Sequence, residues 1–117
     1  MLREANEQAI FVRYCRLKGL RCVFIPNGFP LGRNVNKYAY INSLKTQGYE
    51  TGFCDLMIFA KNTKHNMLFI EFKREKGGKL SEKQKEWQEW LKNMGYASYV
   101  AKGSREAIEI LENFLKE

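Results

Sequence analysis

Three charged side chains lie inside or beside two short apolar runs of the sequence. Asp55 directly precedes residues 56–60, and Glu71 and Lys73 lie within residues 68–73. If the second run is a β-strand, Glu71 and Lys73 project to the same side, roughly 7 Å apart. A carboxylate and an ammonium are costly to bury in such apolar runs unless they pair with each other or with a metal ion. These three residues are therefore candidates for a chemical site.

The chemistry that best fits this set is metal-dependent phosphodiester hydrolysis. The carboxylates of Asp55 and Glu71, with the backbone carbonyl of Phe72 and waters, would satisfy the oxygen preference of Mg²⁺. The cation would activate a water and offset charge that develops on the phosphate, and Lys73 could position the water and stabilise the same charge. Because this spacing also occurs by chance, a salt-bridged Glu71–Lys73 pair on a partly exposed strand remains an alternative.

Cysteine and histidine chemistry is disfavoured by the composition. The three cysteines, Cys15, Cys22 and Cys54, have no CxxC spacing, and His65 is the only histidine. A zinc site needs about four such ligands with local pairing, and one histidine leaves little scope for a Ser-His or Cys-His nucleophile. We expect the cysteines to be reduced and mostly buried, which leaves carboxylates to carry the chemistry.

The whole chain has the properties of one small globular domain that binds a polyanion. Its 117 residues, 44% of them hydrophobic, suffice for one core, and we expect a single domain over residues 1–117. The formal charge of +7 favours nucleic acid as a partner ahead of an anionic membrane, although plain solubility is an alternative. No apolar run reaches the ~20 residues of a membrane span, and residues 1–4 do not resemble a signal peptide, so we expect a cytoplasmic protein.

A first helix, over residues 5–18, would carry two further acids. Glu7 lies three and four positions before the first members of its apolar stripe, and Glu4 lies one turn earlier on the same side. The simpler interpretation of both is a first-turn carboxylate that complements the helix dipole. The stripe itself consists of Ile10, Phe11, Tyr14 and Cys15.

Hydrophobic periodicity and turn residues predict seven further elements. Four are strands, at residues 21–25, 55–60, 67–73 and 96–101, and three are helices, at residues 38–47, 81–94 and 104–115. The order α-β-α-β-β-α-β-α interleaves helices with a small mixed sheet. The predicted fold class is therefore α/β.

The last two predicted helices have recognisable ends and faces. Ser81 and Gln84 fit a capping box, which is a structural role for Gln84. We expect Trp87, Trp90 and Leu91 to point inward. Ser104 should cap the final helix, whose buried stripe would be Ala107, Ile108, Leu111 and Leu115, with Glu109, Glu112 and Lys116 in solvent.

From Glu7 to Phe114, the chain resembles the VRR-NUC family of the PD-(D/E)xK nuclease superfamily. The matching blocks occur in the family's order and are Asn6-Glu7-Gln8, Ile25-Pro26-Asn27-Gly28, Leu44-Lys45-x-x-Gly48, Gly52-x-x-Asp55-Leu56, Ile70-Glu71-Phe72-Lys73, Leu80-Ser81-x-x-Gln84-x-x-Trp87 and Gly95-Tyr96. One position departs from the pattern, because Cys54 stands where the family usually has proline. That proline shapes the backbone and binds nothing, so we expect the site to survive its loss.

The resemblance implies a restriction-endonuclease-like core and a set of site residues. It implies catalytic roles for Asp55, Glu71, Lys73, Gln84 and Glu7, with Mg²⁺, or Mn²⁺ in its place, held by Asp55, Glu71, Glu7 and the Phe72 carbonyl. It thereby favours a metal-site role for Glu7 over the dipole role. Gln84 would orient Lys73 or the water while it caps its helix.

The resemblance also implies hydrolysis of DNA that leaves a 5′-phosphate and a 3′-hydroxyl. Small stand-alone members from phages and bacteria are linked to four-way junctions and often form homodimers, so we expect a structure-selective endonuclease acting in the cytoplasm, that of the host if the protein is viral. The alternatives are a nuclease without branch preference, of flap, nicking or restriction type, and a non-catalytic DNA-binding module. Candidate DNA contacts are Arg33, Lys37, Lys45, Arg74, Lys76 and Lys79.

Overall fold

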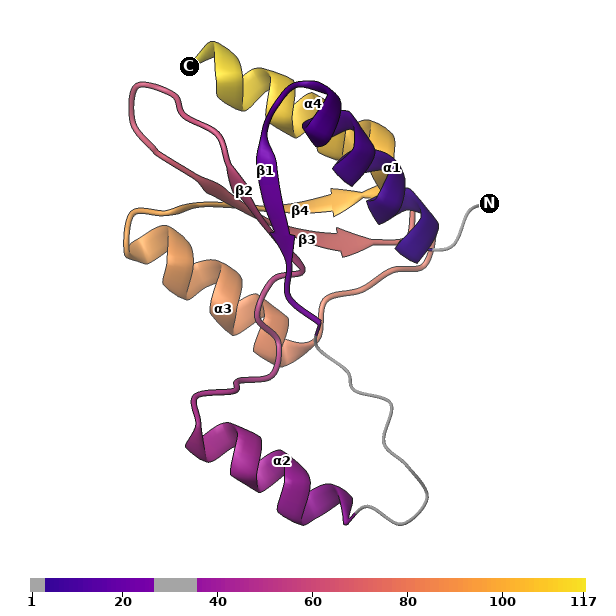
Figure 1. Ribbon diagram of the computed structural model, residues 1–117, viewed down its shortest axis with the longest axis vertical. Coiled ribbons are helices and arrows are strands. Elements are labelled where there is room, and N and C mark those ends of the chain that lie inside the picture. The colour runs from indigo at the N-terminus through magenta and orange to yellow at the C-terminus, as the bar shows by residue number, and fades with distance from the viewer. Residues whose placement is uncertain (1–3, 27–35) are drawn as a thin grey trace.

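Residues 4–26 and 36–117 are described by the computed structural model, and within them the helices and strands follow the predicted order (Figure 1). The strands are β1 (Arg21–Phe24), β2 (Leu56–Phe59), β3 (Leu68–Lys73) and β4 (Ala97–Lys102). The helices are α1 (Glu4–Leu17), α2 (Lys37–Thr46), α3 (Glu82–Asn93) and α4 (Gly103–Lys116). Each end lies within one residue of its prediction, so the α/β order is confirmed.

The four strands form one mixed sheet in the order β1-β2-β3-β4. β1 pairs with β2 and β2 with β3 in antiparallel fashion, and β3 pairs with β4 in parallel fashion through the crossover helix α3. The β2–β3 ladder reaches Leu56 opposite Ile70, and the β3–β4 ladder continues to Lys73 opposite Lys102. β3 therefore extends beyond β2, and its last residues border the segment that holds Asp55.

The two faces of the sheet are covered by different helices. α1 and α4 lie side by side over one face, and α3 lies over the other (Figure 1). Because side chains alternate along a strand, Phe72 enters the core under α1, whereas Glu71 and Lys73 face the side of α3. The core under α1 and α4 includes Phe11, Leu56, Ile58, Leu68, Ile70, Phe72, Leu111 and Phe114.

α3 packs on the sheet through a face that differs from the predicted one. Leu91 is buried as expected and Trp87 is partly buried, but Trp90 is 52% exposed, so its inward prediction is wrong. The other buried residue of α3 is Gln88, whose Oε1 accepts a hydrogen bond from Ser98 Oγ at 2.9 Å. A helix with a buried face centred on residues 88 and 91 turns residue 90 toward solvent.

α2 stands apart from the sheet and the other helices (Figure 1). Asn36 caps it, because the Asn36 side chain accepts a hydrogen bond from the Ala39 N–H at 3.1 Å. None of its residues is buried, and Tyr38 is 85% exposed. The helix therefore gains little from packing on the rest of the described chain.

The N-terminus of α4 is capped from α1 and not by Ser104. The helix begins at Gly103, with φ of +89°, and its N-cap residue Lys102 makes no side-chain cap. Ser104 instead donates its backbone N–H to the Glu7 carboxylate. The predicted Ser104 cap is therefore wrong, because an acid from a neighbouring helix supplies the acceptor.

Two further predictions about burial are wrong, one for Ile10 on α1 and one for Glu112 on α4. Ile10 is 43% exposed, since α1 packs through Phe11 and Cys15. Glu112 is not simply solvated, because α1 and α4 lie side by side. Its carboxylate accepts a hydrogen bond from the Tyr14 hydroxyl and forms an ion pair with Lys18 Nζ at 2.9 Å.

In the part of the chain that the structure describes, no helix is long and apolar enough to cross a membrane.

Candidate functional site

Asp55 is fixed at the point where the β2–β3 ladder ends. Its Oδ2 accepts a hydrogen bond from the backbone N–H of Phe72 at 2.7 Å, so the side chain continues the pairing of the two strands. The preceding loop is held against α3 at Gly52, which has φ of +85° and where a Cβ would lie 2.7 Å from the Lys83 backbone. Only glycine fits this approach, which brings the Asp55 segment onto the first turn of α3.

Glu71 is the most completely buried acid of the described chain, with 2% of its surface exposed. Its Oε2 accepts a hydrogen bond from Gln84 Nε2 at 3.4 Å, whereas its Oε1 is buried with no hydrogen-bond partner among the described residues. Burial, and then the close Asp55 carboxyl, raise the pKa of Glu71 to about 9. A buried carboxylate with an unused oxygen is costly, so this atom calls for a ligand.

Glu4, and not Glu7, completes the acidic cluster. Carboxylate oxygens of Glu4, Asp55 and Glu71 all lie within 4.8 Å of one another. Burial raises the pKa of Glu4, the Asp55 carboxylate raises it further, and Lys73 and Arg74 lower it. Like charges at this separation repel unless a proton or a cation lies among them.

Glu7 lies outside this cluster, which corrects its predicted place in the metal site. Its carboxylate accepts the backbone N–H of Ser104 at the start of α4. Hydrogen bonds from the Ser104 hydroxyl and then from this N–H lower the pKa of Glu7. The residue is 8% exposed, and its contact with Ser104 is that expected of an acid at a helix N-terminus. The structure thus gives Glu7 a structural role at the N-terminus of α4, and not at that of its own helix.

Lys73 and Gln84 border the cluster from β3 and α3. Lys73 is half-buried on the Glu71 face, and its charge lowers the pKa values of Glu71 and Glu4. In the described residues it forms no ion pair with Glu71, which argues against the salt-bridge alternative. Gln84 completes the predicted capping box, since its Oε1 accepts the Ser81 N–H at 2.8 Å, while its Nε2 reaches Glu71. Its partner at the site is therefore Glu71, and not Lys73.

The donor set fits a hard divalent cation. Three carboxylates converge, and one oxygen of Glu71 accepts no hydrogen bond from the described residues. Oxygen ligands are those that Mg²⁺ and Mn²⁺ prefer. The Phe72 N–H points to Asp55, and a strand residue directs its N–H and C=O to the same side. The Phe72 carbonyl thus faces the edge of β3 on which Asp55 lies, as the predicted ligand requires.

The cysteines are structural. All three are free, with Cys15 and Cys54 buried. Burial raises the pKa of Cys54 to about 12, with Glu71 and Asp55 adding to the effect, and burial likewise raises the pKa of Cys15 to about 12. Such thiols are poor nucleophiles near neutral pH, and the expectation of mostly buried cysteines is confirmed.

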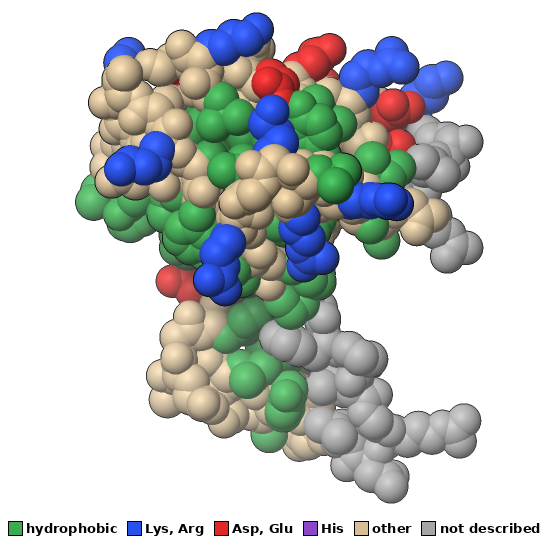
Figure 2. Space-filling view, turned by 45° about the horizontal axis from the view of Figure 1, so that its top comes forward, with side chains coloured by type: hydrophobic (Ala, Val, Ile, Leu, Met, Phe, Trp, Pro, Cys, Tyr) green, Lys and Arg blue, Asp and Glu red, His purple; other side chains and the backbone are tan. Residues whose placement is uncertain are grey.

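The basic residues predicted to contact DNA fall into separate places. Arg74, Lys76 and Lys79 are exposed on the loop that follows Lys73. Lys37 and Lys45 lie at the two ends of α2, and Arg33 is outside the described residues. Figure 2 shows Lys and Arg side chains spread over one face of the main body, and a hollow between this body and α2. Only the loop residues adjoin the carboxylate cluster along the chain.

The match to a family model decides the classification. The model of the VRR-NUC domain matches residues 3–105, which is most of the chain. This chain belongs to the VRR-NUC family. A solved structure described as a VRR_NUC domain protein superposes with a TM-score of 0.78 and 22% sequence identity, covering 99% of this chain and 90% of that one. A search of curated proteins found no sequence that matches the chain.

Membership of the VRR-NUC family confirms the predicted PD-(D/E)xK type of core and implies a nuclease-type function. The residue that sequence reasoning misassigned is Glu4. A helix rises roughly 1.5 Å per residue, so two acids three positions apart share a side and differ by roughly 4.5 Å along the axis. The signal for Glu4 was its place one turn before Glu7, but only the docking of α1 decides which acid reaches Asp55.

Proposed function

We propose that this protein is a divalent-metal-dependent endonuclease that hydrolyses phosphodiester bonds in DNA. The observation that carries the proposal is the convergence of Glu4, Asp55 and Glu71 around a buried oxygen with no hydrogen-bond partner among the described residues. An acidic cluster of this kind is costly to keep in a protein that only binds DNA, which is itself an anion. The family's nuclease-type function supports the same conclusion.

The residues that would hold Mg²⁺, or Mn²⁺ in its place, are Glu4, Asp55 and Glu71 with the Phe72 carbonyl. When bound, such a cation acts as a Lewis acid that lowers the pKa of water and offsets negative charge on a phosphoryl group. Glu71 must be ionised to bind it, and the neighbouring Lys73 charge favours that state by lowering the Glu71 pKa.

The remaining residues position the reacting groups. Lys73 is half-buried beside the three acids, where its ammonium can orient the attacking water and stabilise charge on the scissile phosphate. Gln84 fixes Glu71 by donating to its Oε2, and Ser81 fixes Gln84 in turn through the capping box. The products would be a 5′-phosphate and a 3′-hydroxyl.

We further propose that the substrate is branched DNA, of the four-way junction type, cut by a homodimer in the cytoplasm. A two-fold dimer carries two equivalent sites, which two strands of a junction require. The net charge of +7, with three basic residues on the loop after Lys73, supports a polyanionic substrate. The three free cysteines fit a reducing compartment.

A cleavage panel tests this function. The wild-type chain is incubated with Mg²⁺, Mn²⁺ or a chelator and with linear duplex, a flap, a four-way junction and a single strand. We expect cation-dependent cleavage, fastest on the junction. Asp55→Ala is expected to abolish cleavage and to leave DNA binding largely intact, because Asp55 is a ligand and not a contact for the DNA backbone.

The outcomes separate the alternatives. Cleavage at equal rates on all duplex forms would support the alternative of a nuclease without branch preference, of nicking or restriction type. Faster cleavage of flaps than of junctions would show that the preferred substrate is a flap. Salt-sensitive binding without cleavage under any cation would leave a non-catalytic DNA-binding module. Retained cleavage in Asp55→Ala would show that the site lies elsewhere.

A further inference from the structure

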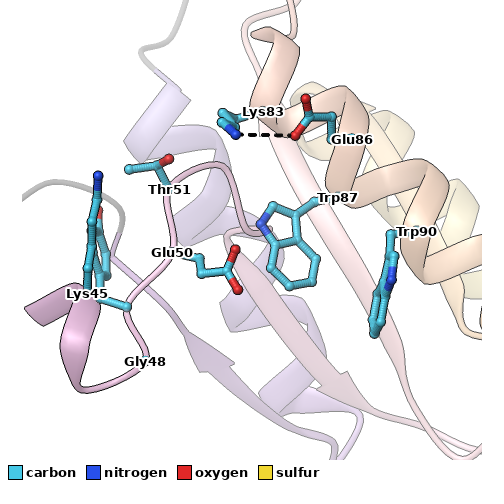
Figure 3. A pocket seen from close by; sticks show the side chains of 9 residues that line it. Lys45, Gly48, Glu50, Thr51, Lys83, Glu86, Trp87 and Trp90 are labelled. Carbon is cyan, nitrogen blue, oxygen red and sulfur yellow. Dashed lines mark ion pairs between the residues drawn. The ribbon is translucent and has the colours of Figure 1, made fainter.

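A groove with aromatic walls lies along α3, the helix that also carries Gln84. Its volume is about 770 Å³, and it lies between the segment that follows α2 and the outer side of α3 (Figure 3). Lys83 lines it and is the direct neighbour of Gln84, whose amide reaches Glu71. One helix, α3, therefore carries a residue of the groove and, one position further on, the residue that contacts Glu71. Its principal side chains are Lys45, Glu50, Lys83, Glu86, Trp87 and Trp90.

Trp87 and Trp90 form an open aromatic corner in this groove. Their ring centroids are 5.6 Å apart and their planes are inclined by 78°, so the two indoles meet edge to face and are not stacked in parallel. Trp87 is held from behind by Phe53, with centroids 4.9 Å apart, whereas Trp90 is 52% exposed. A large aromatic side chain held at a right angle to its neighbour offers a flat surface to a second flat group.

The charges in the groove select a base rather than a phosphate. Lys45 and Lys83 are balanced by Glu50 and Glu86, and Lys83 Nζ lies 3.5 Å from Glu86 Oε2. Such a site has no net positive charge with which to attract a phosphate. A nucleotide base instead stacks on indole and can donate N–H groups to a carboxylate, and Figure 3 shows Glu50 on the side of the groove opposite Trp90.

The volume of the groove fits such an occupant as well. Small-molecule sites range from about 300 to about 1,000 Å³, and this groove lies within that range. The acids of the groove can accept hydrogen bonds from the edge of a base. A base within a duplex is stacked and paired on both sides, so only an unpaired base can enter.

We propose that this groove binds an unpaired base of a DNA strand, stacked on Trp90, next to the scissile bond. The inference rests on the proposed nuclease function and adds to it a reason for preferring DNA with unpaired nucleotides at a branch. The chain has two tryptophans, and both line the groove, so its indole fluorescence reports on this place alone.

The test is a fluorescence titration in the presence of a chelator, so that no strand is cut. The probe is a ten-residue oligodeoxycytidylate, compared with a duplex of equal nucleotide concentration and with free deoxycytidine monophosphate. We expect the single strand to quench the indole emission and the duplex and the mononucleotide to have little effect. Equal quenching by duplex, quenching by the mononucleotide alone, or no quenching by the single strand would overturn the proposal.

Variants locate the contact. Trp90→Ala is expected to weaken single-strand binding about tenfold, measured by anisotropy of a labelled strand, and Trp90→Phe to retain most of it, because loss of one aromatic stacking partner has an effect of that size. The matched control is Phe59→Ala, which removes another exposed aromatic ring, 47% exposed, from the end of β2 opposite Asp55. Equal binding by Trp90→Ala and wild type, or an equal loss in Phe59→Ala, would overturn the assignment.

Cleavage rates keep this inference distinct from the proposed function. If the wild type cuts no DNA with any cation, the nuclease proposal fails, whatever the fluorescence shows. If it cuts DNA, Trp90→Ala is expected to lose rate on a substrate with an unpaired strand and to keep its rate on nicked or linear duplex. Equal loss on all substrates would count against the groove and leave the nuclease proposal standing.

Discussion

Two glutamates of this chain are buried to a similar extent but meet opposite surroundings. Glu7 is 8% exposed and Glu71 is 2% exposed. The Glu7 carboxylate accepts hydrogen bonds at the start of α4, which lower its pKa. The Glu71 carboxylate is crowded by Asp55 and Glu4, has one oxygen without a partner among the described residues, and has a pKa raised to about 9. Burial alone therefore does not distinguish a structural acid from a functional one, whereas the partners of each oxygen do.

The same contrast appears within one helix. Glu4 and Glu7 lie one turn apart on α1, yet Glu4 joins the cluster and Glu7 caps α4. The cap at Glu7 fixes α1 against α4, and this docking holds the first turn of α1 over the end of β3. Glu7 thus acts on the site through the position of Glu4, and we expect the two acids to respond differently to substitution.

The largest expected difference is in cleavage. Glu71→Gln keeps the size of the side chain but removes the charge that the cation requires, and we expect the rate to fall at least about a thousandfold. Glu7→Gln keeps an oxygen that can accept the Ser104 N–H, and we expect it to cleave within about threefold of wild type. Single-turnover rates on a four-way junction with Mg²⁺ measure both. Similar rates in the two variants would remove the distinction between the acids.

Stability is expected to respond in the reverse order. Glu7→Ala leaves the N–H of Ser104 without its acceptor at a buried helix end, and we expect it to lower the free energy of unfolding by about 1–3 kcal/mol. Glu71→Ala in metal-free protein should have a smaller effect than other buried deletions of its size, since it also removes a buried polar atom that lacks a hydrogen-bond partner among the described residues. Urea unfolding with a chelator present gives both values. A neutral Glu7→Ala would contradict the capping role.

The pH dependence of stability should also differ in sign for the two acids. Because the pKa of Glu71 is raised, the folded metal-free chain holds a proton on this residue at pH values where the unfolded chain has released it. Proton binding by Glu71 therefore stabilises the fold fully below about pH 4.5, and this stabilisation is lost as the pH rises toward 9. The lowered pKa of Glu7 gives a contribution that is present above about pH 4.5 and is lost as the pH falls through the lowered value. The slope from one group cannot exceed about 1.4 kcal/mol per pH unit.

Urea midpoints between pH 3.5 and 9 measure these two contributions. In the metal-free chain, Glu71→Gln should flatten the decline on the alkaline side, and Glu7→Gln should flatten the decline on the acidic side. An unchanged alkaline limb in Glu71→Gln would mean that Glu71 is already ionised in the metal-free protein.

Much of this fold can be predicted from the sequence, because its elements are local. Apolar periodicity and turn residues gave each helix and strand to within one residue, and the capping box of Ser81 and Gln84 is legible from its spacing. Alternation in β3 was enough to place Glu71 and Lys73 on one face. What could not be predicted depends on how the helices dock. Contacts between elements distant in the sequence decide three features. They are the choice between Glu4 and Glu7, the capping of α4 by Glu7 and the exposure of Trp90.

Manganese binding by isothermal titration calorimetry tests the central claim most directly, namely that Glu4, Asp55 and Glu71 form a metal site and Glu7 does not. The wild type and the variants Glu4→Gln, Glu71→Gln and Glu7→Gln are titrated under identical conditions. The account predicts that Mn²⁺ binds to the wild type and to Glu7→Gln with similar affinity, and that binding to Glu4→Gln and Glu71→Gln is weakened at least about tenfold. Loss of binding in Glu7→Gln with retention in Glu4→Gln would contradict it.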